Sequence, residues 1–185
     1  MINENELIWE EFLKESPWRY TKVPSSLEVE MNSKNVDDIK NKDYYGSFKN
    51  MEIYHDEENR QGIFYILVDD KFAALYRFKD EGNYLKSKLV WNGKKYPGTL
   101  RTFLAEYLLP KYKVIESDDA FSDDAFTMWQ KMVVMYPHYE FYAKFPDGKM
   151  SKRITNYHEP LIYKEPFPNS RNTMFVMKYN NATKS

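Results

Sequence analysis

The segment that decides the fold is residues 89–129, LVWNGKKYPGTLRTFLAEYLLPKYKVIESDDAFSDDAFTMW. It predicts, in order, a strand, a basic turn with a glycine, an amphipathic helix, a second strand and a second helix. The apolar residues of the first helix, over residues 99–108, recur every three or four positions: Leu100, Phe103, Leu104, Tyr107 and Leu108. Pro110 should end this helix, because the residue before a proline avoids the helical region. Strand, helix and strand indicate a βαβ unit, whose two strands run parallel.

The turn at residues 94–99 (KKYPGT) carries the chemical signal of this segment. It brings two lysines and Gly98 to the start of a helix. The first N–H groups of a helix have no partner inside it, and together with the macrodipole they attract phosphates. We therefore expect this turn to suit a pyrophosphate. The alternative is an ordinary strand-to-helix loop with solvated lysines.

Three strands are predicted before the segment. Residues 62–68 and 72–78 form a hairpin around the polar turn at residues 69–71. Residues 84–91 form the third strand and should place four side chains on one face: Leu85, Ser87, Leu89 and Trp91.

The first fifty residues give weaker patterns. Helical spacing predicts a short helix over residues 6–15, which Pro17 ends. Residues 27–31 alternate like an edge strand, and Asn35 should begin one or two helical turns. Residues 44–46 interrupt the pattern, and residues 51–54 suggest another short strand.

After the segment's second strand, residues 113–117, Ser122 should cap the next helix. Its buried side is predicted to consist of Ala125, Phe126, Trp129, Met132 and Val133. Tyr136 and Pro137 end it, and residues 139–145 alternate into a strand that turns at residues 146–149. Residues 174–179 make the last strand. We divide the chain into an N-terminal segment packed on the body (1–50), a main domain (51–179) and a tail (180–185).

Composition excludes several classes of protein. At 185 residues the chain predicts one domain, and the absence of cysteine rules out disulfides and thiolate metal sites. A formal net charge of −1 gives no global attraction to nucleic acid or to an anionic membrane. No apolar run approaches the roughly 18 residues that span a bilayer, and the acidic start is unlike a signal peptide. We expect a cytoplasmic protein.

The predicted order of elements resembles that of the GCN5-related N-acetyltransferase (GNAT) family over residues 51–179. The resemblance implies an α/β fold of the mixed α+β kind, with a mostly antiparallel sheet and one parallel βαβ pair. In that family the turn before the central helix reads basic-x-x-Gly-x-Gly/Ala and binds the pyrophosphate of acyl-CoA. Lys95 and Gly98 match this pattern, with Thr99 between, whereas Leu100 replaces the small last residue.

The family's next helix reads Asn-x-x-Ala-x-x-x-Tyr, with the tyrosine protonating the leaving thiolate. Here Ser122, Ala125 and Trp129 stand at these positions. Tryptophan cannot protonate a thiolate, and the strand before the turn carries no carboxylate. The resemblance implies a cofactor, acetyl-CoA or another acyl-CoA, with its thioester carbonyl polarised by a strand N–H. The residues implied to contact it are Val90, Trp91, Lys95, Gly98, Thr99, Leu100, Ser122 and Trp129.

Two functions remain open. The first is transfer of an acyl group from acyl-CoA to an amine, with no catalytic residue identified; Tyr136, Tyr139 and Tyr142 are candidates for a displaced general acid. The second is a catalytically inactive GNAT-fold protein that binds and modulates a partner protein. Lysine outnumbers arginine, as in A+T-rich genes of low-GC bacteria and their phages, so a phage protein acting on a host factor is one form of this hypothesis.

Other clusters have simpler interpretations. The aspartates at 118, 119, 123 and 124 lack the glycine and closing glutamate of a calcium loop, and we interpret them as a solvated loop and a helix start. His55 precedes three acidic residues, but three scattered histidines do not predict a metal site. Trp91 to Tyr96 mixes aromatic and basic residues as nucleic-acid grooves do, yet too few to predict one. Trp129 could line a pocket or belong to the core. Homodimer formation stays open.

Overall fold

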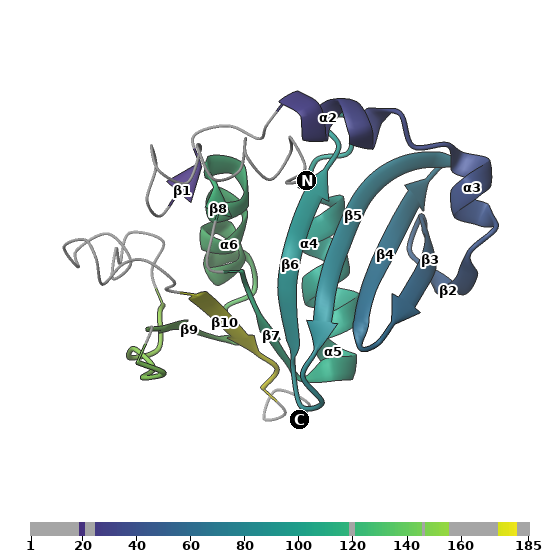
Figure 1. Cartoon of the computed structure of the whole chain (residues 1–185). Helices are drawn as coiled ribbons and strands as arrows, with labels where there is room; N and C mark the ends of the chain where they lie inside the picture. Colours follow the sequence, from purple (N-terminus) through teal and green to yellow (C-terminus); the bar gives the residue numbers. More distant parts are fainter. Residues whose placement is uncertain (1–18, 21–24, 119–120, 146, 156–173, 181–185) are drawn as a thin grey trace, which may run out of the picture.

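The computed structural model describes residues 19–20, 25–118, 121–145, 147–155 and 174–180 (Figure 1). Its centre is an eight-stranded sheet in the order β2-β3-β4-β5-β6-β7-β10-β9. Within this sheet β6 and β7 run parallel, and the other neighbours are antiparallel. The prediction of a mixed α+β fold, mostly antiparallel with one parallel βαβ pair in the sheet, is confirmed.

The strands are β1 (Arg19–Tyr20), β2 (Asp43–Phe48), β3 (Met51–Glu58), β4 (Gln61–Val68), β5 (Lys71–Asp80), β6 (Leu85–Asn92), β7 (Val114–Glu116), β8 (Phe121–Ser122), β9 (Glu140–Lys144) and β10 (Met174–Lys178). The helices are α2 (Ser25–Asn32), α3 (Val36–Lys40), α4 (Thr99–Thr102), the π-helix η1 (Phe103–Leu108), α5 (Leu109–Tyr112) and α6 (Asp123–Met135). Strands β1 and β8 form a separate parallel pair.

The hairpin of β4 and β5 follows the prediction. Asp69 and Asp70 join the two strands with φ angles of 50° and 56°. Left-handed backbone at both positions matches a two-residue turn whose twist suits the flanking strands. The fully buried side chains on these strands include Phe64, Ile66, Ala74 and Tyr76.

Strand β6 contains a β-bulge that the sequence did not reveal. Ser87 pairs with Phe78 and Leu89 pairs with Arg77, so Lys88 is an extra residue on β6. Leu85 packs in the cluster beneath α4 to α6, whereas Trp91 packs in the cluster on the opposite face. The prediction that residues 85, 87, 89 and 91 share one face is wrong, because one inserted residue reverses the alternation of side chains.

The back layer is a continuous helical segment, α4-η1-α5, packed on the sheet together with α6. The apolar stripe of the segment is buried as predicted, apart from half-buried Tyr107. Pro110 does not end the helix, which runs to Tyr112 and stops at Lys113 with a φ of 67°. Proline has no N–H to donate within the helix, and in the widened turn η1 the Ala105 carbonyl instead accepts the Tyr139 hydroxyl at 3.0 Å.

The front layer consists of α2 and α3, which cover part of the other face of the sheet. Met31 and Ile39 pack there against Tyr65 and Leu75. The prediction of a strand at residues 27–31 is wrong, because these residues lie in the helix α2. Val29, which the alternation of apolar and polar residues would place in a sheet, is 68% exposed. Asn35 begins α3 as predicted, accepting the Asp37 N–H on its side-chain oxygen at 3.0 Å.

Other predicted features have mixed outcomes. Residues 44–46 do not interrupt the sheet but lie in β2, with a bulge between Tyr44 and Gly46. The strand predicted at residues 51–54 continues to Glu58, and β9 and β10 pair antiparallel. The predicted helix at residues 6–15, the tail after residue 180 and the turn residue Pro146 lie outside the described residues. No helix in the described part of the chain has the length and apolar character needed to cross a membrane.

Candidate functional site

The candidate site lies where β6 and β7 separate. These strands pair only at Leu85–Ile115 and Lys86–Glu116. Strand β7 ends at Glu116, while β6 continues to Asn92 along β5 alone. Among the residues that the structure describes, the second half of β6 therefore has no neighbouring strand on the side that β7 occupied.

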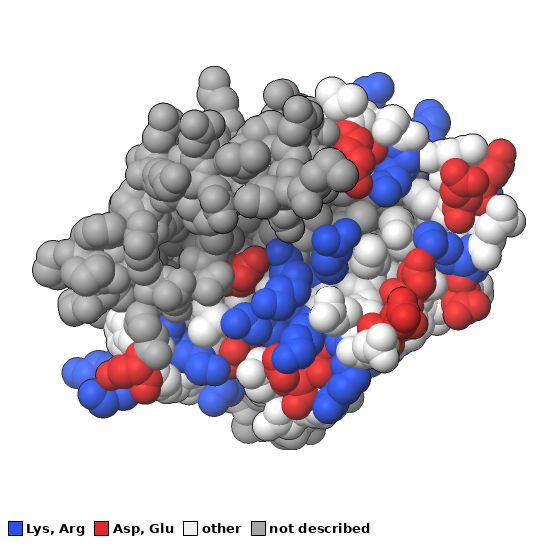
Figure 2. All heavy atoms as spheres, in the orientation of Figure 1, with Lys and Arg blue, Asp and Glu red and all other residues white. Residues whose placement is uncertain are grey.

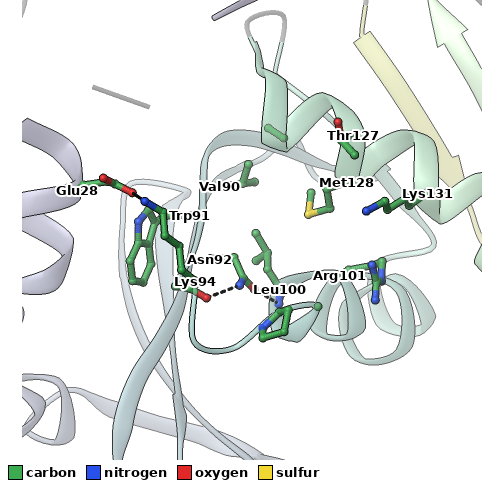
Figure 3. Close-up of a pocket in the computed structure, with 14 residues that line it drawn as sticks. Glu28, Val90, Trp91, Asn92, Lys94, Leu100, Arg101, Thr127, Met128 and Lys131 are labelled. Atoms are coloured by element: carbon green, nitrogen blue, oxygen red, sulfur yellow. Dashed lines mark hydrogen bonds and ion pairs between the residues drawn. The ribbon is translucent and has the colours of Figure 1, made fainter. Parts of the chain in front are cut away.

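A pocket of about 330 Å³ occupies this opening (Figure 3). Its walls come from the end of β6, the basic turn, the start of α4, one side of α6 and Glu28 of α2. Val90, Leu100 and Met128 supply apolar surface. The volume lies at the lower end of the range for small-molecule sites, roughly 300–1,000 Å³. The pocket can thus hold part of a cofactor-sized ligand.

The side chain of Asn92 fixes the shape of the basic turn. Its amide nitrogen donates to the carbonyls of Gly93 at 2.9 Å and Tyr96 at 2.8 Å. Its oxygen accepts the backbone N–H of Leu100 at 2.9 Å. One of the first amides of the helix is therefore already bonded, which reduces the number of backbone donors that this turn offers to a phosphate.

Gly98 is the N-cap of α4 and has a φ of 82°. Residues with a Cβ rarely adopt this left-handed conformation, so glycine favours the turn. A Cβ at this position would also lie 2.7 Å from Nη2 of Arg101. The glycine therefore lets the backbone turn directly beneath the guanidinium group.

The backbone of β6 presents Val90 to the opening. The Gly93 N–H donates to the carbonyl of Ala73 in β5 at 2.8 Å. Peptide groups alternate in direction along a strand, so the Trp91 amide also faces β5. The amides of Val90 and Asn92 face the other way, toward the side that β7 has left. Among the residues that the resemblance implies as cofactor contacts, Val90 is therefore the one on β6 whose N–H faces the opening.

The rim of the pocket is cationic. Lys94, Arg101 and Lys131 line it, against the single carboxylate of Glu28 among its described lining residues. Lys94 lies 3.0 Å from Glu28, and its side chain is 85% exposed. Arg101 is half-buried, and its Nε atom is buried without a hydrogen-bond partner. Buried donors are usually satisfied, so Arg101 retains capacity to bind an anion.

The structure brings together half of the eight residues predicted to contact a cofactor. Val90, Trp91, Gly98 and Leu100 line the pocket. The neighbouring residues Lys95 and Thr99 do not line it, and Lys95 is exposed.

The two residues predicted on the following helix fall elsewhere. Trp129 is 1% exposed and stacks on Phe175, with ring centroids 6.2 Å apart. It belongs to the core and not to the pocket lining, so the structure supports the second of the two interpretations of Trp129 and not the predicted contact with a cofactor. Ser122 pairs through its backbone with Tyr20, and its side chain lies outside the described part of the structure.

Sequence reasoning missed several lining residues. Arg101 lies three residues after Gly98 on the same helix, a spacing that could have suggested it. Met128 and Lys131 lie three residues apart on α6 and could have been found in the same way. Glu28 gave no signal, because its place at the pocket depends on how α2 packs on the sheet.

The tyrosines proposed as displaced acids lie outside the pocket lining. The hydroxyl of Tyr136 donates to Glu106 at 3.0 Å, and that of Tyr142 donates to Glu140 at 2.9 Å. Burial raises the pKa of Tyr136 and of Tyr139, which makes them poorer proton donors. These hydroxyl groups serve the fold.

His55 stacks on Phe64 at 4.6 Å, and burial lowers the pKa of its imidazole. Its Nε2 atom lies 3.3 Å from the Glu57 carboxylate. Among the described residues, no group of three or more His, Cys, Asp or Glu side chains could hold a metal ion.

Comparisons with protein-family models, curated proteins and solved structures found no match to this chain. Its function is therefore argued from the site itself.

Proposed function

We propose that the domain binds an acyl-CoA in the pocket between β6 and α6 and transfers the acyl group to an amine, as a GNAT-like protein. The observation that carries this proposal is the separation of two parallel strands after two residue pairs, with a pocket in the opening. The GNAT resemblance gives the same place to the cofactor. That resemblance is an analogy of fold, so the chemistry of the pocket has to support it.

The lining suits an anionic ligand with an apolar arm. Arg101 and Lys131 can bind phosphate oxygens, with Arg101 able to present two donors. Val90, Leu100 and Met128 can contact the pantetheine arm and the acyl group. A whole CoA exceeds the pocket, so the nucleotide would lie on the surface beside Lys94.

The acyl-transfer step uses positioned backbone more than side chains. The Val90 N–H would donate to the thioester carbonyl and stabilise the negative charge that develops there. The amine nitrogen forms a bond to the carbonyl carbon, and the C–S bond breaks to release CoA thiolate. Glu28 would hold the acceptor as its ammonium ion and accept the proton that the amine must lose before it attacks. The second proton, which the nitrogen loses once the new bond has formed, would pass through water to the CoA thiolate, which leaves as the thiol.

Calorimetry with acetyl-CoA tests binding, with a matched pair of glycine variants. Gly98→Trp fills the mouth of the pocket and should abolish binding. Gly148→Trp imposes similar backbone strain, since Gly148 has a φ of 83°, but no atom lies within 4 Å of its would-be Cβ. We expect it to bind normally. An absence of heat with millimolar acetyl-CoA, or equal affinity in the two variants, would reject the proposal.

A partner-binding function without catalysis is the second candidate. It is favoured by the pocket lining, in which no described residue is a tyrosine, histidine or cysteine, and by the core position of Trp129. An assay of free thiol released from acetyl-CoA, with spermidine and lysine methyl ester as acceptors, separates the candidates. A transferase should release CoA faster than uncatalysed hydrolysis of acetyl-CoA does. Glu28→Gln should raise the KM for the amine. Binding of acetyl-CoA without acceptor-dependent release would favour the second candidate.

A further inference from the structure

The front face of the sheet carries a basic patch below the part that α2 and α3 cover. Figure 2 shows lysine and arginine side chains gathered over β5 and β6 in the middle of this face. The residues of the basic patch are Arg77, Lys79, Lys86, Lys88 and Lys144. Because the whole chain has a net charge of −1, this concentration is local.

Two lysines of the basic patch oppose each other directly. Lys79 on β5 and Lys86 on β6 are cross-strand partners in register. Like charges in this position destabilise a sheet. Lys79 relieves part of the repulsion by pairing with Glu81 at 2.8 Å. Lys86 is also the cross-strand partner of Glu116 on β7, which balances part of its charge. The like-charged pair with Lys79 still costs stability, which suggests that the charges have another use.

Three cations of the basic patch are uncommitted. Arg77, Lys86 and Lys88 form no ion pair with any residue that the structure describes. Lys88 is exposed because it is the extra residue of the bulge in β6. Lys144, by contrast, lies 2.8 Å from the buried Glu116. The bulge thus adds an exposed charge beside two that are already unpaired.

The surroundings of the basic patch distinguish between anionic partners. Arg77 lies between half-buried Ile63 and Leu89 on the neighbouring strands. Carboxylates at Glu81 and Glu116 lie among the cations and would repel a phosphate backbone. The half-buried Tyr84 ring lies under the Lys144 ammonium at 5.5 Å, so it offers no stacking platform. Apolar residues between mixed charges suit a protein surface instead.

We infer that the basic patch docks an acidic surface of a partner protein, in addition to the proposed ligand pocket. Complementary charge would steer the encounter and fix the orientation of the partner. The basic patch includes Lys86, where β6 is paired on both sides, whereas the pocket lies along the unpaired half. The two sites can therefore be tested separately.

The experiment uses poly-L-glutamate as the probe and two double variants with the same change in net charge. Lys86→Glu/Lys88→Glu reverses two uncommitted charges of the basic patch. Lys71→Glu/Lys152→Glu is the control, since both lysines are exposed and lie outside the basic patch. In fluorescence anisotropy at low salt, we expect the first variant to lose about tenfold in affinity and the control less than about threefold.

A thermal melt guards against misfolding. The change at Lys86 places a carboxylate opposite Lys79 on β5 but also opposite Glu116 on β7. These two effects oppose each other, so the melting temperature should change little although binding falls. Equal affinities in the two variants would overturn the inference. Tighter binding of an oligo-dT strand than of poly-L-glutamate, lost on the same two substitutions, would overturn it in favour of nucleic acid.

Discussion

The first half of β6 (residues 85–87, the closed half) lies between two strands. In the described part of the chain, its second half (residues 89–92, the open half) has a strand on one side only. Leu85 is fully buried between β5 and β7, and Val90 is half-buried at the pocket. The bulge at Lys88 separates the halves and reverses the alternation of side chains, so that Leu85 and Trp91 lie on opposite faces of the sheet. The comparison teaches that the candidate site arises where strand pairing stops.

The largest expected effect contrasts one residue from each half. Leu85→Ala should destabilise the protein by about 3 kcal/mol, because it leaves a cavity in a closed part of the core. Val90→Ala should cost about 1 kcal/mol, because its side chain already borders a pocket. Denaturation in urea, followed by circular dichroism, measures both. Equal losses would show that the second half is packed as closely as the first.

Asn92→Ala tests whether the side chain of Asn92 holds the basic turn at the end of the open half. The change leaves two carbonyls and one amide without their partner, and we expect a loss of about 2 kcal/mol. Affinity for acetyl-CoA should fall as well, since the basic turn would lose its shape. The control is Asn83→Ala, at an exposed position in the turn before β6, with an expected change below about 0.5 kcal/mol. If Asn92→Ala matches the control, the hydrogen bonds of Asn92 do not hold the turn.

A smaller effect is expected at a buried hydroxyl pair in the closed half. The Tyr76 and Ser87 oxygens are 3.1 Å apart, and Tyr76 is fully buried. Ser87→Ala should lower the free energy of unfolding by about 1 kcal/mol, because it leaves the buried tyrosine hydroxyl without a hydrogen-bond partner. Adding Tyr76→Phe should recover part of that loss, because no unpaired hydroxyl remains. A double variant with the full sum of the single losses would contradict this pairing.

The smallest effect is a pH dependence near the closed half. His55 stacks with Phe78, the cross-strand partner of Ser87. Burial lowers the pKa of His55 in the folded state below the ordinary value of 6.5. The unfolded chain therefore binds more protons between the two pKa values, so stability is lost as the pH falls below about 6.5. His55→Phe keeps a stacked ring and should remove this part of the pH dependence in melts. If the melting temperatures of the unchanged protein and of His55→Phe fell equally as the pH was lowered, the assigned role of His55 would be contradicted.

The order of elements could be predicted because it depends on local patterns. The β4–β5 hairpin, the stripe from Leu100 to Leu108 and the parallel pair all follow from periodicity and turn residues. Pro110 misled because an interaction distant in sequence, from Tyr139, takes the carbonyl that its missing N–H would leave. Residues 27–31 misled because a five-residue alternation is too short to distinguish a strand from a helix.

The candidate site could be predicted only in part. Gly98 and Val90 were found because a glycine turn after a strand has a local signature. Lys95 was preferred to Lys94, although Lys94 is the one of these two that lines the pocket, because neighbouring lysines carry the same signal in sequence. Glu28 and Asn92 could not be assigned, since their roles depend on packing and on side-chain hydrogen bonds across the turn.

A titration of isotope-labelled protein with acetyl-CoA, followed by the chemical shifts of backbone amides, tests the central claim most directly. The account predicts saturable shifts at Val90, Gly98 and Met128, with Leu85 and Ser87 unchanged in the closed half of the same strand. Shifts that are absent at millimolar ligand, or that fall on the closed half instead, would contradict it.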